Sequence, residues 1–301
     1  MHRRSVLITG ASSGIGRATA VALARQGARL FLAGRSEERH RDVLAQTRAA
    51  GAEVSYLELD LGSLRSVRAC AERFLALGQP LHVLLNNAGL AGSRGLTADG
   101  FERTFGVNHL GHFLLTELLL ERLRSSAPSR IVNVASKAHY DPRQIDWPAL
   151  RKPTRSTTGF PEYGVSKLCN VLHAKHLAVR LAGSGVTSYS LHPGVIASDV
   201  WRHVPWGLRH LMLLFMRSAE EGAATSLHCA CSERAATETG LYYDTSQPIA
   251  PSPLADDPAL QRELHERSLD WVREGTSPAP DAERRRSAQL NDRASAPADA
   301  G

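Results

Sequence analysis

Tyr163 and Lys167 lie four residues apart, in a segment with helical periodicity that begins near residue 160. Side chains at this spacing share one face of a helix, so the phenol and the ammonium group can point into one site. A free tyrosine has a pKa near ~10, but a cation held close to it stabilises the phenolate and lowers that pKa. The pair therefore predicts a general acid/base at Tyr163, although this spacing alone is common in proteins.

Two apolar segments end in small polar residues that could join the same site. Residues 131–135 have the composition of a buried strand and are followed by Ser136, while Leu84-Leu85 precede the run from Asn86 to Gly89. In a doubly wound sheet, ligands bind at the carboxyl ends of the strands. Ser136 is therefore expected to hydrogen-bond a substrate oxygen beside Tyr163, and the small residues after Leu85 leave room for a cofactor.

The segment Thr9–Gly16 is rich in glycine and lies between a predicted strand and a predicted helix, the context that a dinucleotide-binding loop requires. Gly10 permits a tight turn, Gly14 lets the backbone approach a pyrophosphate, and Gly16 lets the helix pack on the strand. The helix N-terminus then offers free N–H groups to the phosphates. The expected contacts of this loop with the cofactor are Gly10, Ser12, Ser13, Gly14, Ile15 and Gly16.

The end of the second predicted strand bears on the type of cofactor. A loop that prefers NAD usually carries a carboxylate here, which binds the ribose 2′-hydroxyl. This chain has Gly34 at that position and so lacks the carboxylate, and Arg35 supplies a guanidinium suited to a 2′-phosphate. Glu37 and Glu38 are expected on the first turn of the next helix, where the helix dipole favours acidic side chains. These residues favour NADP(H), and NAD(H) stays open.

Taken in order, the motifs resemble those of the short-chain dehydrogenase/reductase family over about residues 5–245. The matching features are the glycine loop, Asn86-Asn87-Ala88-Gly89, Asn108, Ser136, the Tyr163/Lys167 pair and Pro193-Gly194. Three further segments are similar to the retinol dehydrogenase branch of that family: 107–115, 125–134 and 226–230.

The resemblance implies a role for each matching residue. Tyr163 would donate a proton to a carbonyl oxygen or accept one from an alcohol, and Lys167 would bind the nicotinamide ribose and lower the Tyr163 pKa. Ser136 would orient the substrate oxygen, and Asn108 would hold a water that links Lys167 to solvent. The other implied cofactor contacts are Tyr163 itself, Asp60 and Leu61 beside the adenine, Asn86, Ala88 and Gly89 in the cleft, and Pro193 and Gly194 near the nicotinamide.

The implied activity is NADP(H)-dependent interconversion of an apolar aldehyde or ketone and its alcohol by hydride transfer. Residues 195–217 occupy the place of the family's substrate loop, and their Trp, Leu, Met and Phe content favours an apolar substrate. The same segment could instead be a core helix, an oligomer interface or a membrane-surface contact. Two other functions stay open: an NAD-dependent secondary-alcohol dehydrogenase, and a non-catalytic NADP(H)-binding sensor or scaffold. By analogy, the chain is expected to form a homodimer or homotetramer.

The elements that must position these residues alternate along the chain. The expected strands are 6–9, 29–33, 54–59, 83–86, 130–135, 187–191 and 240–243. The expected helices are 14–26, 37–50, 64–77, 100–124, 160–183 and 218–232, and 141–160 is expected to be a surface loop. Strands that are apolar throughout suit a parallel sheet with helices on both faces. The pattern predicts one α/β domain over residues 1–274, a Rossmann-type doubly wound sheet of about seven strands, and a disordered tail at 275–301.

Composition excludes several other classes of protein. The net charge of +6 comes from basic residues spread along the chain, with no basic run interleaved with aromatic residues, so nucleic-acid binding is not expected. Four cysteines are too few for a disulfide scaffold, and no histidine or cysteine spacing predicts a metal site. No signal peptide or transmembrane anchor is evident, which favours a cytoplasmic location. His139 and His192 are expected to be structural.

Overall fold

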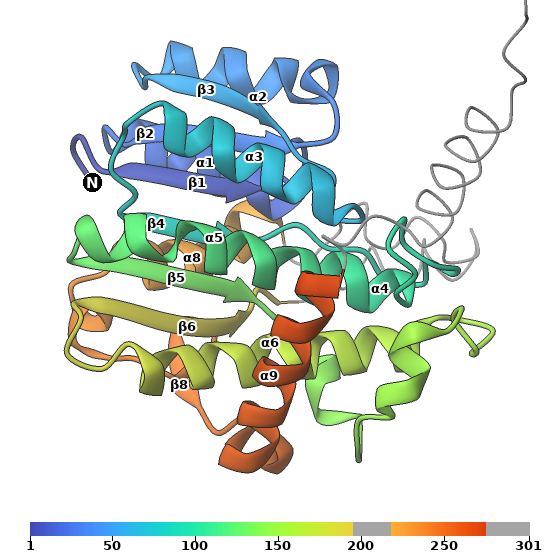
Figure 1. Cartoon of the computed structure of the whole chain (residues 1–301). Helices are drawn as coiled ribbons and strands as arrows, with labels where there is room; N and C mark the ends of the chain where they lie inside the picture. The colour runs from blue at the N-terminus through green and yellow to red at the C-terminus, as the bar shows by residue number, and fades with distance from the viewer. Residues whose placement is uncertain (195–217, 275–301) are drawn as a thin grey trace, which may run out of the picture.

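The computed structural model describes residues 1–194 and 218–274. In these parts of the chain, eight strands form one sheet in the order β3-β2-β1-β4-β5-β6-β7-β8 (Figure 1). Every neighbouring pair is parallel except β7 and β8. The strands are β1 (Ser5–Thr9), β2 (Arg29–Gly34), β3 (Val54–Glu58), β4 (Val83–Asn86), β5 (Ser129–Val134), β6 (Val186–His192), β7 (Tyr242–Asp244) and β8 (Gln247–Ile249). The predicted doubly wound α/β fold is confirmed.

The order of the strands alone predicts where a ligand binds. The chain runs outward from β1 to β3 and then returns to the other side of β1 with β4. The connections therefore leave the sheet in opposite directions at the carboxyl ends of β1 and β4. Open α/β sheets bind their ligands at such a switch point. The glycine loop follows β1 and the Asn86–Gly89 run begins at the end of β4, so both lie there.

Helices cover both faces of the sheet. They are α1 (Gly14–Arg25), α2 (Glu37–Ala49), α3 (Leu64–Ala76), α4 (Arg103–Phe105), α5 (Gly111–Ser125), α6 (Phe160–Arg180), α8 (Ala219–Cys231) and α9 (Pro258–Glu274). Helices α3, α5, α6 and α9 pack on one face and α1, α2 and α8 on the other (Figure 1). Within β1, Leu7 belongs to the first of these cores, and Val6 and Ile8 to the second. This alternation explains why the strand is apolar throughout.

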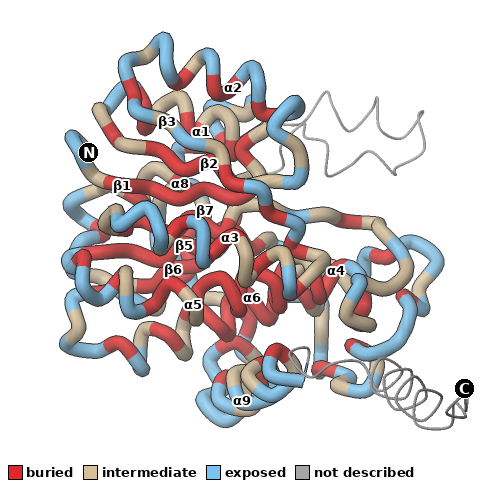
Figure 2. Tube along the Cα trace, turned by 45° about the horizontal axis from the view of Figure 1, so that its top comes forward, coloured by how far each residue is buried: buried red, intermediate tan, exposed pale blue. Residues whose placement is uncertain are grey.

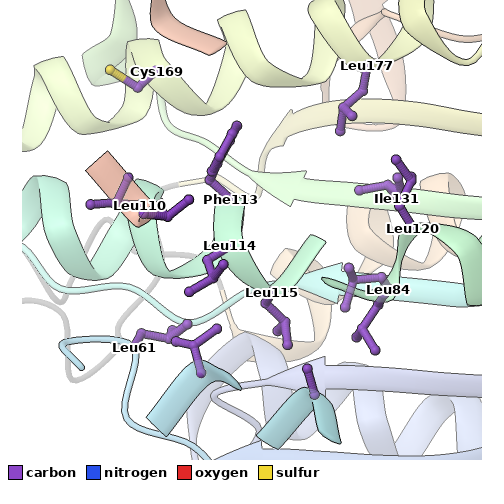
Figure 3. Packing of buried hydrophobic residues seen from close by; sticks show 14 of the residues in the cluster. Leu61, Leu84, Leu110, Phe113, Leu114, Leu115, Leu120, Ile131, Cys169 and Leu177 are labelled. Atoms are coloured by element: carbon purple, nitrogen blue, oxygen red, sulfur yellow. The ribbon is translucent and has the colours of Figure 1, made fainter. Parts of the chain in front are cut away.

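Figure 2 shows that the buried positions follow the strands and the inner sides of the helices, and Figure 3 shows how one of the two cores is filled. Leu114 and Leu115 of α5 belong to this core, together with Leu84 of β4 and Ile131 of β5. All four side chains are almost entirely buried. The sheet edge that holds the motifs is therefore backed by a packed core, which fixes the positions of the strand ends.

Helix α2 begins at Glu37, the residue at which the sequence predicts a helix. Ser36 precedes α2, and its hydroxyl accepts a hydrogen bond from the backbone N–H of Arg39 at 3.3 Å. Glu37 and Glu38 occupy the first turn of this helix, as expected. The carboxylates that follow Arg35 therefore stabilise the N-terminus of α2 through the helix dipole.

Four features differ from the sequence-based predictions. Helix α9 was not predicted, although Leu264 and Val272 bury one of its faces. The predicted helix at 100–124 is divided, because a π-helical turn at Gly106–Leu110 separates α4 from α5. Strand β8 adds an antiparallel edge. The predicted surface loop at 141–160 contains a 3₁₀ turn at Trp147–Arg151, because the apolar side chains of this segment reach the core.

The expected substrate loop at 195–217 and the expected tail at 275–301 lie outside the described residues. Among the helices that are described, none has both the length and the apolar character needed to cross a membrane.

Candidate active site

Ser136 and Tyr163 come together at the carboxyl edge of the sheet. Ser136 follows β5, and Tyr163 lies in the first turn of α6, where its side chain is hydrogen-bonded to Ser136. Gly164 permits this approach, because a Cβ at that position would lie 2.9 Å from the carbonyl oxygen of Ala138. The helix can therefore pack directly on the turn after β5, which brings the phenol to the serine hydroxyl.

Lys167 lies one turn further along α6 and is 3% exposed. Its ammonium nitrogen donates a hydrogen bond to the carbonyl oxygen of Val134 at 2.8 Å, and it lies 5.6 Å from the centroid of the Tyr163 ring. The two side chains therefore share one helix face, as their spacing predicts. Burial lowers the pKa of Lys167 to about 7.

The pKa of Tyr163 moves against the sequence-based expectation. Burial raises this pKa above its ordinary value, and the hydrogen bond with Ser136 opposes the shift only in part. The predicted lowering by Lys167 is therefore not found. Desolvation acts on both partners, because it disfavours the charged phenolate and the charged ammonium group alike.

Asn108 holds the loop after β4. Its side-chain oxygen accepts a hydrogen bond from the N–H of Leu90, and its amide nitrogen donates to the Leu90 carbonyl, both at 2.9 Å. The amide nitrogen also donates to the hydroxyl of Ser166 on α6 at 3.0 Å. A Cβ at Gly89 would lie 3.4 Å from the Lys167 nitrogen and 3.5 Å from the Asn108 side-chain oxygen. Asn108 therefore fixes the backbone beside Lys167. That it also holds a water linking Lys167 to solvent stays a prediction.

The glycine loop is built by close backbone approaches. Gly10 has φ +70°, and a Cβ there would lie 2.8 Å from the Cα of Ala88. At Gly16 a Cβ would lie 2.4 Å from the carbonyl oxygen of Gly10. Ser13 is the N-cap residue of α1, but its side chain makes no capping hydrogen bond, so the first N–H groups of α1 have no side-chain acceptor there. The donors that phosphates require are present in this loop.

A cavity of about 370 Å³ extends along the carboxyl ends of β1, β2, β3 and β4. The predicted cofactor residues that line it are Gly10, Ser12, Arg35, Asp60, Leu61, Ala88 and Gly89. The other predicted contacts are not among its lining residues: Ser13, Gly14, Ile15, Gly16, Asn86, Tyr163, Lys167, Pro193 and Gly194. A concave site with basic side chains beside an uncapped helix N-terminus fits the adenosine and phosphate parts of a dinucleotide.

Comparison with known proteins agrees with this arrangement. Residues 4–148 match the family model for short chain dehydrogenases. Retinol dehydrogenase 12 from Homo sapiens is 46% identical over 255 residues, which cover 83% of this chain and 80% of that protein. Retinol dehydrogenase 11 from Homo sapiens is 44% identical over 273 residues, which cover 89% and 85%. The chain belongs to the short-chain dehydrogenase family. It is a retinol dehydrogenase-like member and therefore an oxidoreductase that acts on CH–OH and C=O groups.

Solved structures of this family have the same fold. An actinorhodin polyketide ketoreductase with NADPH is 26% identical, with a TM-score of 0.64 over 80% of this chain and 96% of that one. The RhlG/NADP active-site complex from Pseudomonas aeruginosa is also 26% identical, with a TM-score of 0.65 over 80% and 94%. The cofactor of this short-chain dehydrogenase is accordingly a nicotinamide dinucleotide, NAD(H) or NADP(H).

His112 is a residue of this dehydrogenase's site that the sequence analysis missed. The hydroxyl oxygen of Thr9 accepts the backbone N–H groups of Asn87 and Ala88, both at 3.0 Å, so its own proton is directed to Nε2 of His112 at 2.8 Å. The Nδ1–H of His112 then donates to the carbonyl oxygen of Asn108 at 3.0 Å. Burial lowers the pKa of His112 to about 4, which keeps the ring neutral. One side chain thus links both cofactor loops to Asn108, and its position four residues after Asn108 was the available signal.

Asn86 contributes to the sheet rather than to the cavity lining. Its amide nitrogen donates to Thr116 on α5 and to the side-chain oxygen of Asn133 on β5, both at 3.0 Å, and the residue is 2% exposed. The neighbouring Asn87 holds the glycine loop instead. Its amide nitrogen donates to the carbonyl oxygens of Thr9 at 2.8 Å and Gly10 at 3.2 Å. Which of two adjacent asparagines faces the loop depends on the strand register, and sequence alone does not fix that register.

His139 has the bonding expected of a structural histidine. Its Nδ1 donates to the carbonyl oxygen of Ser136 at 2.7 Å, and its Nε2 accepts the backbone N–H of Ser252 at 3.0 Å. His192, the other expected structural histidine, is 5% exposed at the end of β6. Across residues 1–194 and 218–274, no group of three or more His, Cys, Asp or Glu side chains could hold a metal ion.

Proposed function

We propose that the chain is an NADP(H)-dependent oxidoreductase that interconverts apolar aldehydes or ketones and their alcohols, retinoids included, with Tyr163 as acid/base. The observation that carries the proposal is the contact between Tyr163 and Ser136 at the sheet edge, with Lys167 one helical turn away. An acid, a second hydroxyl and a cation at this edge are the groups that a carbonyl oxygen needs as it becomes an alkoxide.

The nicotinamide ring supplies or accepts the hydride when it is bound. The side chains handle the proton and the developing charge. The raised pKa keeps Tyr163 protonated at neutral pH, so its phenol can donate a proton to the substrate oxygen during reduction. The Ser136 hydroxyl orients the same oxygen. In alcohol oxidation the phenolate form of Tyr163, stabilised by the Lys167 ammonium group, accepts the proton that leaves the alcohol hydroxyl.

The substrate class rests on the similar proteins. Two of those reported above are named as retinol dehydrogenases, and retinol is an alcohol with a long apolar chain. We expect the purified chain to oxidise NADPH in the presence of retinal and long aliphatic aldehydes, with a much smaller rate on a polar aldehyde such as glyceraldehyde. The absorbance of NADPH at 340 nm measures each rate. A protein that binds NADPH but reduces no carbonyl compound in a broad panel would be a sensor or scaffold instead.

The preference for NADP(H) is assigned to Arg35, which lines the cavity beside Ser36 and Arg39. Arg35→Ala is expected to weaken NADPH binding about tenfold to a hundredfold, because a charge-assisted hydrogen bond is worth ~1.5–3 kcal/mol. The affinity for NADH should change little. Fluorescence titration measures both affinities, and Arg41→Ala on the exposed side of α2 is the matched control. Equal losses for the two cofactors would remove Arg35 from the choice between them.

A further inference from the structure

His40 is a buried side chain of α2 that lines the cofactor cavity together with Arg35 and Arg39. It is 2% exposed. Its Nδ1 lies 2.8 Å from the carbonyl oxygen of Ser36, and a carbonyl oxygen can only accept, so Nδ1 carries the proton. Within the part of the chain that the structure describes, Nε2 is buried and has no hydrogen-bond partner. A buried polar atom without a partner is costly, unless a ligand completes its bonding.

The His40 ring occupies the space that a side chain at residue 34 would need. A Cβ at Gly34 would lie 2.3 Å from Cε1 of His40 and 2.8 Å from Nε2, but 3.4 Å from Nδ1. The unpartnered Nε2 edge therefore faces the end of β2. Tyr56 holds the ring from β3, with 5.3 Å between the two ring centroids, and the Tyr56 hydroxyl donates to the Gly34 carbonyl at 2.6 Å. No carboxylate can be added at Gly34 while this ring stays in place.

The end of β2 is where dinucleotide-binding folds distinguish the 2′-hydroxyl of NAD from the 2′-phosphate of NADP. We propose that His40 is a specificity-determining residue for this position: its neutral ring accepts a hydrogen bond from the ribose 2′-hydroxyl, and its imidazolium form donates one to the 2′-phosphate. The inference rests on the proposed function, in which a nicotinamide dinucleotide fills the cavity. With His40 in this role, the chain binds both cofactors, and the ratio of its NADPH and NADH affinities depends on pH.

The direction of the pH dependence follows from the surroundings of His40. Burial lowers its pKa, and the hydrogen bond to Ser36 opposes that shift in part, so the free protein holds the ring neutral at pH 7. A bound 2′-phosphate favours the protonated ring, so NADPH binding takes up a proton and weakens as the pH rises. NADH binding has no such dependence. The charged and titratable groups around the ring are Arg35, Glu37, Glu38 and Arg39 beside it, Tyr56 and Glu58 on β3, and Asp60 at the cavity.

The test compares NADPH and NADH affinities at pH 6.5 and 8.5, by fluorescence titration of wild type and His40→Gln. Glutamine keeps a polar side chain but cannot be protonated. We expect the NADPH Kd of wild type to rise about tenfold between the two pH values, the worth of one charge-assisted hydrogen bond. In His40→Gln this rise should be lost, and the NADH Kd should be flat in both proteins. His2→Gln, at the exposed N-terminal end, is the control and should behave as wild type.

Each outcome separates the two proposals. An equal pH dependence of NADPH binding in wild type and His40→Gln would overturn the role of His40 and leave the proposed function intact. Wild type that bound neither dinucleotide would overturn the proposed function itself. The NADH affinity of His40→Gln also shows whether the variant is folded. A second pair of variants tests whether the His40 ring occupies the space of a side chain at residue 34. Gly34→Asp should bind both cofactors poorly. Gly34→Asp combined with His40→Ala should recover NADH binding but not NADPH binding.

Discussion

Tyr163→Phe is expected to lower kcat for aldehyde reduction by about 10²–10⁴-fold, the usual contribution of a positioned general acid. The substitution removes one oxygen atom from a side chain that is hydrogen-bonded to Ser136, and it leaves the ring in place. The NADPH Kd should stay within about twofold, because the cavity residues around the adenosine end are untouched. Steady-state rates at 340 nm and fluorescence titration measure the two quantities.

Tyr243→Phe is the matched control for this prediction. Tyr243 is also buried and loses the same atom, but it packs in the core that contains α1, α2 and α8, where its hydroxyl is bonded to Glu238. It should retain activity with a modest loss of stability. An unchanged kcat for Tyr163→Phe would show that another group transfers the proton. An equal fall in both variants would indicate that general destabilisation causes the loss.

Local sequence patterns were sufficient where one segment determines its own geometry. The placement of the glycine loop, the Tyr163/Lys167 pair and the start of α2 at Glu37 are such cases. The loop lies between β1 and α1, the pair shares one face of α6, and α2 begins at the predicted residue. Their geometry depends on residues a few positions apart, which the periodicity of a strand or helix places directly. The parallel order of the sheet follows from the same alternation of elements.

The features that were missed depend on contacts between distant segments. His40 is significant only because β2 ends in a glycine beneath it, and His112 only because Thr9 lies 2.8 Å from its ring. The pKa of Tyr163 is a third case. The spacing correctly placed a cation nearby, but burial cannot be measured from a spacing, and burial dominates the shift. Desolvation depends on the whole fold, so it cannot be inferred from a motif four residues long.

The same burial gives Lys167 an opposite effect on activity and on stability. Lys167→Met is expected to reduce kcat by about 10²-fold or more, because the phenolate of Tyr163 loses its nearby cation. We expect the free energy of unfolding nevertheless to increase, by about 1–3 kcal/mol at pH 7. This gain is smaller than the full cost of the pKa shift, because the variant also loses the hydrogen bond to Val134.

The stability difference between wild type and Lys167→Met should change with pH in a defined direction. The pKa of Lys167 is about 7 in the folded protein, against ~10.4 in an unfolded chain. Below about pH 7 both states carry the charge, so the folded state bears the whole cost of burying it. Between about pH 7 and 10 the folded state binds fewer protons than the unfolded state, and wild-type stability therefore rises with pH relative to the variant. The advantage of Lys167→Met should be largest at or below pH 7 and small by about pH 10.

Urea unfolding of both proteins between pH 6 and 10 measures this difference. Lys175→Met, two turns further along α6, is the control, because Lys175 is partly exposed and pairs with Asp256 at 2.7 Å. Its loss should cost no more than ~1 kcal/mol, leave kcat near wild type and change little over this pH range. If Lys167→Met were less stable than wild type at every pH, the hydrogen bond to Val134 would outweigh the cost of the buried charge. In that case Lys167 would be a structural anchor of α6 as well as a part of the acid/base site.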